Sequence, residues 1–445
     1  MKLLHHLACL LAILLVALAE ENNRTGWDLC SPINGFGFKH AAKISEPTRD
    51  TLTHRFSRLR GIKGPAGRLS AVSALSRASR DAHDSADKPY QNITALGEFS
   101  TQYAIECEWD GVPVSLLFDT GSSDTWAVRG EFECEDNLGQ LDLQAACGFG
   151  SPFIDSFAHG EVDDIHFYVK YGSGEDVSGP MGYSDISCGG LSVSKQQVGL
   201  ASTTYWHGNN VTVGILGMAY PSISNAFYGP IGQEAEWNTV TYSSFLTTAI
   251  SQGNMDPIFS VAIMKNSSDG MLAWGGLPPI PYDRNKNASA DLLIANLIDQ
   301  DETAWKYSFY TIVPDGMRWG STMDDTRYPY VVDTGTTLMY LPPPLLEAIA
   351  AAFVPQAVYL YQWDSYFVNC KANPPELAVV IGGVEFRINP ADLIYRDVVD
   401  PMTGYCAIAI ASGGSGPYIL GDVFLQNVVA VFDVGGAEMR FYARI

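Results

Sequence analysis

A short phrase centred on an aspartate occurs twice in this chain, and that repeat constrains the fold more than any other feature. Residues 116–123 read LLFDTGSS and residues 330–337 read YVVDTGTT, so each copy joins an apolar β-forming run to Asp-Thr-Gly and two hydroxyl residues. A matching apolar-apolar-glycine triplet follows each copy, at 215–217 and at 419–421. A repeat of this kind predicts two related lobes, each of which contributes one aspartate to a shared site.

The two central aspartates, Asp119 and Asp333, indicate acid–base chemistry. Like charges a few ångströms apart cannot both ionise, so one carboxyl of a close pair keeps its proton while the other is charged. Such a pair offers a general base and a general acid in one cleft, and it can activate water against an amide carbonyl without a metal. A single Asp-Thr-Gly is an ordinary turn sequence, but two copies with matched flanks are a much stronger signal.

With these motifs, the chain resembles the pepsin-like aspartic endopeptidases over roughly residues 95–445, and its length and spacing look like those of a secreted fungal member. The resemblance implies an all-β, bilobal fold of two pseudo-symmetric lobes with a few short helices and a cleft between them. It also implies that Asp119 and Asp333 are the catalytic pair. A proton shared by two aspartates is an established property of that family. No cofactor and no metal are expected.

The resemblance assigns roles to the neighbours of the two aspartates. Ser122 and Thr336 match the hydroxyls that hydrogen-bond the carboxylates, and Gly121 and Gly335 complete the two motifs. The chain departs from the family pattern at Asp124, where the family usually has asparagine. Because Asp124 lies close to the motif and can ionise, we expect it to shift the pH profile.

A second element of the resemblance is a hairpin flap that closes over bound peptide. Tyr171, Gly172 and Ser173 match its tip, and Trp126 matches the tryptophan that packs near the flap tyrosine. The residues themselves also predict a strand that enters a glycine-rich turn. Without the two aspartates, an ordinary surface hairpin would be the preferred interpretation.

The N-terminal region differs from the rest of the chain. Lys2 and the apolar run 7–19, which ends in small residues, predict a signal peptide over 1–19. Residues 20–90 form the expected propeptide, although no dibasic pair marks its end. Residues 1–90 hold 13 Lys and Arg against 8 Asp and Glu, which leaves 14 and 41 of the chain's 27 and 49 for the remainder. A basic leader held on an acidic body is released as acid neutralises the carboxylates, so we expect a zymogen activated in acid.

In a zymogen, a lysine of the leader could block the dyad, and the sequence does not decide which one does so. The candidates are Lys43, Lys63 and Lys88. A disordered polar linker is the alternative interpretation for residues 70–88.

The acidic body argues against nucleic acid and anionic membranes as partners, and no segment after the signal is long and apolar enough to cross a bilayer. We expect a secreted monomer that acts on polypeptides and binds its own propeptide before activation, with vacuolar residence as the alternative.

Cysteine usage fits a secreted protein, because six cysteines remain beyond the signal and the leader. The family pattern implies the pairs Cys134–Cys147 and Cys370–Cys406, which leaves Cys107–Cys188; the residues alone do not fix the connectivity. No paired C-x-x-C supports a zinc site. Acceptor sequences for N-glycans begin at Asn92, Asn210, Asn266 and Asn287.

Short strands are expected throughout, for example at 103–109, 114–118, 259–264 and 428–432, with helices at 242–252 and 344–353. Glycines and prolines over 275–281 predict the crossover between an N-terminal lobe, 91–283, and a C-terminal lobe, 284–445.

Other chemistries have little support in the sequence. The eight histidines are scattered, and neither a metalloprotease helix nor a serine-hydrolase elbow is present. The alternative to an enzyme is a catalytically inactive relative that binds or inhibits another protein in the same cleft, but both aspartate motifs and the flap tyrosine are intact.

Overall fold

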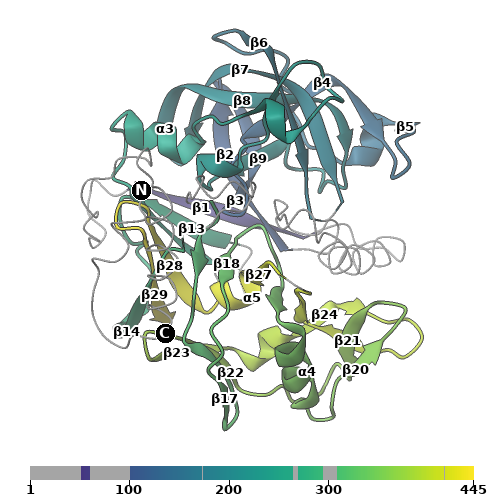
Figure 1. Ribbon diagram of the computed structural model, residues 1–445, viewed down its shortest axis with the longest axis vertical. Coiled ribbons are helices and arrows are strands. Elements are labelled where there is room, and N and C mark those ends of the chain that lie inside the picture. The colour runs from purple at the N-terminus through teal and green to yellow at the C-terminus, as the bar shows by residue number, and fades with distance from the viewer. Residues whose placement is uncertain (1–51, 61–100, 173, 264–268, 294–307, 415) are drawn as a thin grey trace, which may run out of the picture.

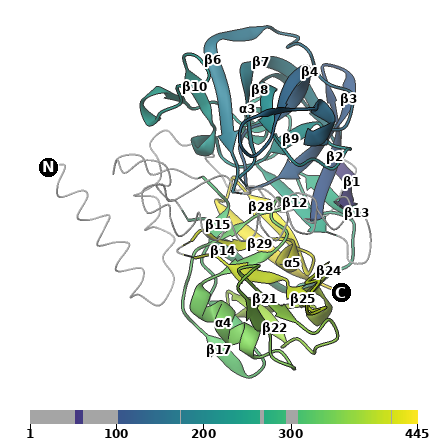
Figure 2. The same ribbon diagram turned by 90° about the vertical axis from the view of Figure 1, so that its right-hand side faces the viewer.

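The computed structural model describes residues 52–60, 101–172, 174–263, 269–293, 308–414 and 416–445. Strands dominate it, and they form two lobes, one above the other, with a further group of strands between them (Figure 1). The predicted all-β, bilobal fold is therefore confirmed. The lobes and the intervening strands remain distinct when the molecule is turned (Figure 2).

The upper lobe contains most of a 16-stranded sheet, whose order runs β11-β10-β6-β7-β8-β4-β9-β3-β2 on this side. Its strands are β2 (Thr101–Trp109), β3 (Val112–Asp119), β4 (Trp126–Glu135), β5 (Leu141–Asp142), β6 (Glu161–Lys170), β7 (Asp176–Cys188), β8 (Leu191–Tyr205), β9 (Gly214–Gly217), β10 (Ala226–Tyr228) and β11 (Thr239–Val240), and α3 (Phe245–Ser251) packs beside them.

The same sheet continues between the lobes in the order β1-β13-β12-β28-β29-β14. These strands are β1 (Leu52–Arg60), β12 (Ile258–Ile263), β13 (Asp269–Trp274), β14 (Tyr282–Asp291), β28 (Val428–Asp433) and β29 (Glu438–Arg444). Strands β12 and β28 are buried along their whole length, which explains why they read as continuous apolar runs rather than as an alternation.

Three smaller sheets form the lower lobe. The first comprises β15 (Thr311–Ile312), β18 (Tyr330–Val332), β27 (Tyr418–Leu420), β19 (Met339–Leu341) and β26 (Ile410–Ser412). The second comprises β17 (Thr322–Asp324), β16 (Gly316–Trp319), β22 (Leu377–Ile381) and β23 (Val384–Ile388). The third comprises β20 (Val358–Leu360), β21 (Ser365–Val368), β25 (Cys406–Ile408) and β24 (Ile394–Val399), and the helices are α4 (Pro343–Ala351) and α5 (Asp422–Leu425).

The sequence repeat has a direct counterpart in the pairing of strands. In the upper lobe, β3 runs parallel to β9, so that Leu117 lies opposite Ile215 and Asp119 opposite Gly217. In the lower lobe, β18 runs parallel to β27 in the same way. Each aspartate motif is thus held beside the apolar-apolar-glycine triplet that follows it in the sequence.

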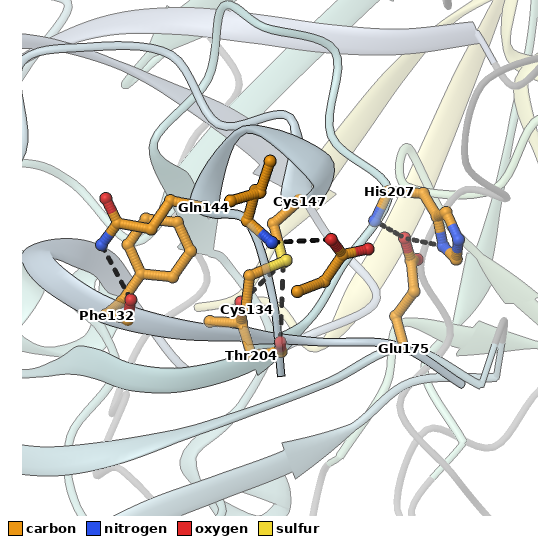
Figure 3. Close-up of a disulfide and its surroundings, with 9 residues drawn as sticks. Phe132, Cys134, Gln144, Cys147, Glu175, Thr204 and His207 are labelled. Carbon is orange, nitrogen blue, oxygen red and sulfur yellow. Dashed lines mark hydrogen bonds and ion pairs between the residues drawn. A yellow bond between two sulfur atoms is a disulfide. The ribbon is translucent and has the colours of Figure 1, made fainter. Parts of the chain in front are cut away.

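All three expected disulfides form, namely Cys107–Cys188, Cys134–Cys147 and Cys370–Cys406. Figure 3 shows the second of them beside Gln144, whose side-chain amide donates to the carbonyl of Phe132 at 2.8 Å. Cys107 and Cys188 lie opposite each other on β2 and β7, so this disulfide staples two neighbouring strands.

Several expected boundaries differ from the observed ones. Helix α3 begins at Phe245 rather than at Tyr242, because Ser244 has extended backbone angles and takes the N-cap position. Residue 283 falls within β14, and the division into lobes at that residue stays a prediction. Strand β1 was not expected at all, and it comes from the leader. Among the described residues, no helix is long and apolar enough to cross a membrane.

Candidate active site

The two aspartate motifs meet where the lobes join. Asp119 ends β3, and Asp333 directly follows β18. Both side chains are buried, at 1% and 0% exposure. Two carboxyls from distant parts of the chain thus share one interior site.

Reciprocal hydrogen bonds lock the two motif loops together. The backbone N–H of Thr120 donates to Oγ1 of Thr334 at 3.1 Å, and the N–H of Thr334 donates to Oγ1 of Thr120 at 3.0 Å. Each hydroxyl in turn donates across the interface, Thr120 to the carbonyl of Val332 and Thr334 to the carbonyl of Phe118, both at 3.2 Å. The threonine of Asp-Thr-Gly therefore fixes the relative position of the two lobes at this point.

Each carboxyl receives the same two hydrogen bonds from its own motif. Asp119 accepts from the N–H of Gly121 at 2.7 Å and from the hydroxyl of Ser122 at 2.5 Å. Asp333 accepts from the N–H of Gly335 at 2.8 Å and from the hydroxyl of Thr336 at 2.6 Å. These contacts leave the two carboxyls in equivalent, opposed orientations.

The pair differs in its electrostatics. Burial raises the pKa of Asp119, and the bonds from Ser122 and Gly121 oppose that rise. Burial also raises the pKa of Asp333, well above its usual range, and the charge of Asp119 raises it further. One carboxyl of the pair is therefore charged while the other keeps a proton, and the stronger rise in pKa favours Asp333 as the protonated one.

The glycines of the motifs are needed for this close approach. A Cβ placed on Gly121 would lie 2.6 Å from the carboxyl atoms of Asp333, and one on Gly335 would lie 2.4 Å from Oδ1 of Asp119. Real Cβ atoms essentially never come so close, so any larger residue would push the carboxyls apart.

The expected flap is the hairpin of β6 and β7, and its turn follows Tyr171. The ring of Tyr171 is fully buried, and its hydroxyl accepts a bond from Nε1 of Trp126 at 2.7 Å. Trp206 packs edge-on against both rings, at centroid distances of 5.5 and 5.3 Å. The structure thus brings Tyr171 and Trp126 together; Gly172 follows in the turn, and Ser173 lies outside the described residues.

Asp124, the departure from the family pattern, is buried and fully engaged. Its carboxyl accepts from the hydroxyl of Tyr242 at 2.7 Å and from the side-chain amide of Asn225 at 2.7 Å, with further bonds from the Asn225 N–H. Burial raises the pKa of Asp124, and the Asn225 and Tyr242 bonds oppose that rise. The sequence singled out Asp124 but gave no signal for these two partners.

The chain has five acceptor sequences for N-glycans, counting one at Asn23 in the leader, and two of them lie in the described residues. Asn210 is exposed, with a φ of 60°. Asn287 is half-buried on β14, and its side-chain amide donates to the carbonyl of Arg284 at 2.8 Å. Asn92 and Asn266 fall outside the described residues, as do Lys43, Lys63 and Lys88.

Comparison with known proteins identifies the family. Residues 110–443 match the model of the eukaryotic aspartyl protease family. The chain belongs to that family. Because its relatives are named as peptidases, this aspartyl protease is a peptide-bond hydrolase that acts on polypeptides.

Individual relatives support the same conclusion. The aspartyl protease is 36% identical over 340 residues to a probable aspartic-type endopeptidase of Aspergillus fumigatus, covering 74% of this chain and 75% of the relative. It is 27% identical over 346 residues to human gastricsin, covering 73% and 76%. The crystal structure of an aspartic proteinase from Irpex lacteus is similar in fold, with a TM-score of 0.56 at 19% identity, covering 77% of this chain and 94% of that one.

Proposed function

We propose that this aspartic endopeptidase is a secreted, acid-acting enzyme made as a zymogen, and that Asp119 and Asp333 hydrolyse peptide bonds through a shared water molecule. The observation that carries the proposal is the matching arrangement of two buried carboxyls, each held by a backbone N–H and a hydroxyl of its own motif. Such an arrangement can hold one proton between two otherwise equivalent acids.

The different environments of the two carboxyls assign their roles. Asp119, which ionises first, takes a proton from water as the water oxygen bonds to the scissile carbonyl carbon. Asp333, which keeps its proton, donates it to the carbonyl oxygen. The resulting gem-diol returns one hydroxyl proton to Asp333, while Asp119 protonates the leaving nitrogen as the C–N bond breaks. The products are a carboxyl and an amine, and the dyad again holds one proton.

The hairpin of β6 and β7 closes over the bound peptide in this proposal. Its glycine-rich turn lets backbone approach backbone, while the buried Tyr171 anchors it to Trp126. An extended peptide would lie between this hairpin and the dyad. By resemblance, we expect the scissile bond to be flanked by bulky apolar residues.

The leader keeps the enzyme inactive until it is removed. Support comes from β1, which lies between β2 and β13 in the sheet that joins the lobes, so the leader is part of the fold before processing. The basic character of residues 1–90 and the acidic character of the remainder supply an attraction that acid weakens. Three disulfides fit an extracellular or vacuolar protein.

Proteolysis by purified protein tests the chemistry. Wild-type protein is incubated with denatured haemoglobin at about pH 3.5 and at neutral pH, with and without pepstatin, beside an Asp119→Asn variant. We expect cleavage in acid that pepstatin stops and that the variant lacks. Folded, processed wild-type protein that cleaves nothing at either pH would instead favour a binding protein of the same fold.

Processing is tested by the mass and N-terminal sequence of the secreted protein. We expect a species cleaved after Ala19 that shortens further in acid, to an N-terminus near residue 90. If Asp119→Asn still shortens when no other protease is present, activation by the dyad itself is ruled out.

Loss of mass on enzymatic removal of N-glycans, absent from an Asn210→Gln variant, would assign a glycan to that exposed asparagine.

A further inference from the structure

Three of the histidines that are scattered in the sequence have comparable contacts in the structure. Of the described side chains, His159, His166 and His207 each contact a carboxylate at the β6–β7 hairpin, the expected flap. Histidine is the side chain whose charge ordinarily changes between pH 5 and pH 8. A contact that needs a protonated histidine would therefore respond to a change from acid to neutral conditions.

His166 makes a contact of this kind. It lies on β6 at 4% exposure, and both ring nitrogens face acceptors: Nδ1 lies 2.7 Å from the carbonyl of Gly229, and Nε2 lies 2.9 Å from Oε1 of Glu234. A carbonyl cannot donate, so Nδ1 must carry a proton. With Nδ1 protonated, a neutral ring presents a lone pair at Nε2. Nε2 can therefore bond Glu234 only if the ring or the carboxylate carries one additional proton.

The environment of Glu234 places that extra proton on the ring. Although burial disfavours its charge, the N–H of Gly232, 2.7 Å from Oε1, and His166 bring the pKa of Glu234 below its usual range. Phe227 stacks on the imidazole at 5.8 Å between centroids and holds its plane. Once the ring loses this proton, two lone pairs face each other across 2.9 Å.

Neighbouring titratable groups do not replace this proton. Tyr168 lies two residues further along β6, and burial, Asp176 and Glu234 raise its pKa to about 12, so it stays neutral. Asp164, on the same strand, holds the segment through its backbone carbonyl, which accepts from the N–H of Gly229. Lys170 and Asp176 interact with each other further along the hairpin.

The other two histidine contacts differ from that of His166. Glu175 accepts the backbone N–H of His207 at 2.8 Å, a bond that needs no titrating proton, while Nδ1 of the His207 ring lies further away, 3.5 Å from the same oxygen; Figure 3 shows this pair beside the disulfide. His159 and Asp185 lie at the surface, with side chains 30% and 52% exposed, where such pairs contribute little.

The His166 pair connects the hairpin to residues 225–242, which we term the side segment. Strand β10 of this segment pairs with β6. Both ends of the segment are fixed near the dyad, because Asn225 and Tyr242 bond the buried carboxyl of Asp124. The His166–Glu234 contact is therefore the titratable link between the hairpin and the middle of a segment whose ends are anchored.

We infer that His166 and Glu234 form a proton-requiring clamp that positions the β6–β7 hairpin, and that release of this clamp near neutral pH weakens peptide binding. His166 and Glu234 act as positioning residues, since neither reaches the dyad. The effect on peptide binding rests on the proposed function, whereas the release itself does not.

Glu234→Gln separates this idea from a merely structural role. One oxygen of Glu234, Oε1, meets both the N–H of Gly232 and Nε2 of His166, and a glutamine oxygen can take that place without the negative charge. The variant clamp still needs the extra proton but holds it less tightly, so it should be released at a lower pH. His166→Asn keeps a donor near Gly229 but cannot reach Glu234, so it should be released at every pH.

Hydrogen exchange is the direct measurement, made from pH 5 to pH 7.5 and corrected for the intrinsic pH dependence of exchange. We expect protection of residues 230–238 to fall about tenfold in the wild type, to fall at a lower pH in Glu234→Gln and to be low throughout in His166→Asn. His159→Gln should follow the wild type. Constant protection in the wild type, or a wild-type profile in either clamp variant, would overturn the inference.

Peptide hydrolysis then tests the consequence for catalysis. Relative to its own optimum, Glu234→Gln should lose kcat/KM at a lower pH than the wild type on the neutral side of the profile, and the loss should be in KM. An unchanged neutral limb would overturn the link to peptide binding. If no variant cleaves peptide at any pH, the proposed function fails, while the exchange data still decide whether the clamp exists.

Discussion

At the scale of single residues, the two carboxyls of the site receive equivalent hydrogen bonds but differ in charge. Ser122 and Thr336 make equivalent bonds to the two carboxyls, at 2.5 and 2.6 Å. The asymmetry arises because only one carboxyl can ionise, and the pKa of Asp333 is raised by burial and then by the charge on Asp119. Small changes in the hydrogen bonds should therefore decide at which pH the charge appears.

Ser122→Ala tests this dependence. The Ser122 hydroxyl stabilises the charged form of Asp119, so its removal raises the pKa of that carboxyl further. We expect the acid-side limb of the kcat/KM profile to move up by about one pH unit. Ser123→Ala is the matched control, because the Ser123 hydroxyl is buried without a hydrogen-bond partner. Equal profiles for the two variants would contradict the assigned role of Ser122.

At the scale of elements, the dyad depends on two strand-to-loop turns that nearly touch. Each turn carries a glycine whose missing side chain makes room for the opposite aspartate. The reciprocal threonine bonds then hold the turns together. The three residues of Asp-Thr-Gly thus serve both packing and chemistry: the aspartate carries the carboxyl, the threonine joins the two turns, and the glycine leaves room for the opposite aspartate.

Gly121→Ala and Gly335→Ala should each separate the carboxyls. Because the added methyl would lie within 2.6 Å of a carboxyl atom, we expect activity to fall at least about a hundredfold, as when a catalytic group is displaced by roughly 1 Å. Gly111→Ala, whose Cβ would meet nothing within 4 Å, controls for a general effect of alanine, although its φ of +79° adds strain. Activity measured on proteins with matched circular dichroism would decide; wild-type rates in both motif variants would contradict the argument.

The sequence predicted the elements that carry a local signal. The doubled aspartate phrase and its triplets were enough for two lobes that each contribute one aspartate, but they did not predict the parallel pairs β3–β9 and β18–β27. The hydrogen bond from Tyr242 to Asp124 joins residues 118 positions apart, and the sequence around neither residue predicts it. Strand β1 was missed for the same reason, because its partners β2 and β13 lie far along the chain.

His166 is a clearer example of what cannot be predicted from the sequence. A lone histidine in a strand is ordinary, and its meaning depends on Glu234, 68 residues away. Only the pairing of β10 with β6 brings the two together. The flap hairpin could be read from its glycines, whereas the contacts that position it could not.

At the scale of the whole molecule, buried carboxyls should make stability depend on pH. Asp119, Asp124 and Asp333 are all buried, and burial raises the pKa of each above the ordinary value of 3.8. The folded state therefore holds these protons more tightly than the unfolded chain does. Their contribution to stability is fully present below about pH 3.8 and is lost as the pH rises through the folded-state pKa values.

We expect the free energy of unfolding to fall from acid to neutral pH, by about 1.4 kcal/mol for each unit by which one pKa is raised. Urea unfolding from pH 3 to pH 7 measures this, and Asp333→Asn serves as the reference protein so that self-digestion does not interfere. Adding Asp119→Asn should flatten the pH dependence, since it removes one of the buried carboxyls. Adding Asp397→Asn, at an exposed position, should leave it unchanged. A double variant with Asp119→Asn that keeps the full slope would show that the loss of stability arises outside the dyad.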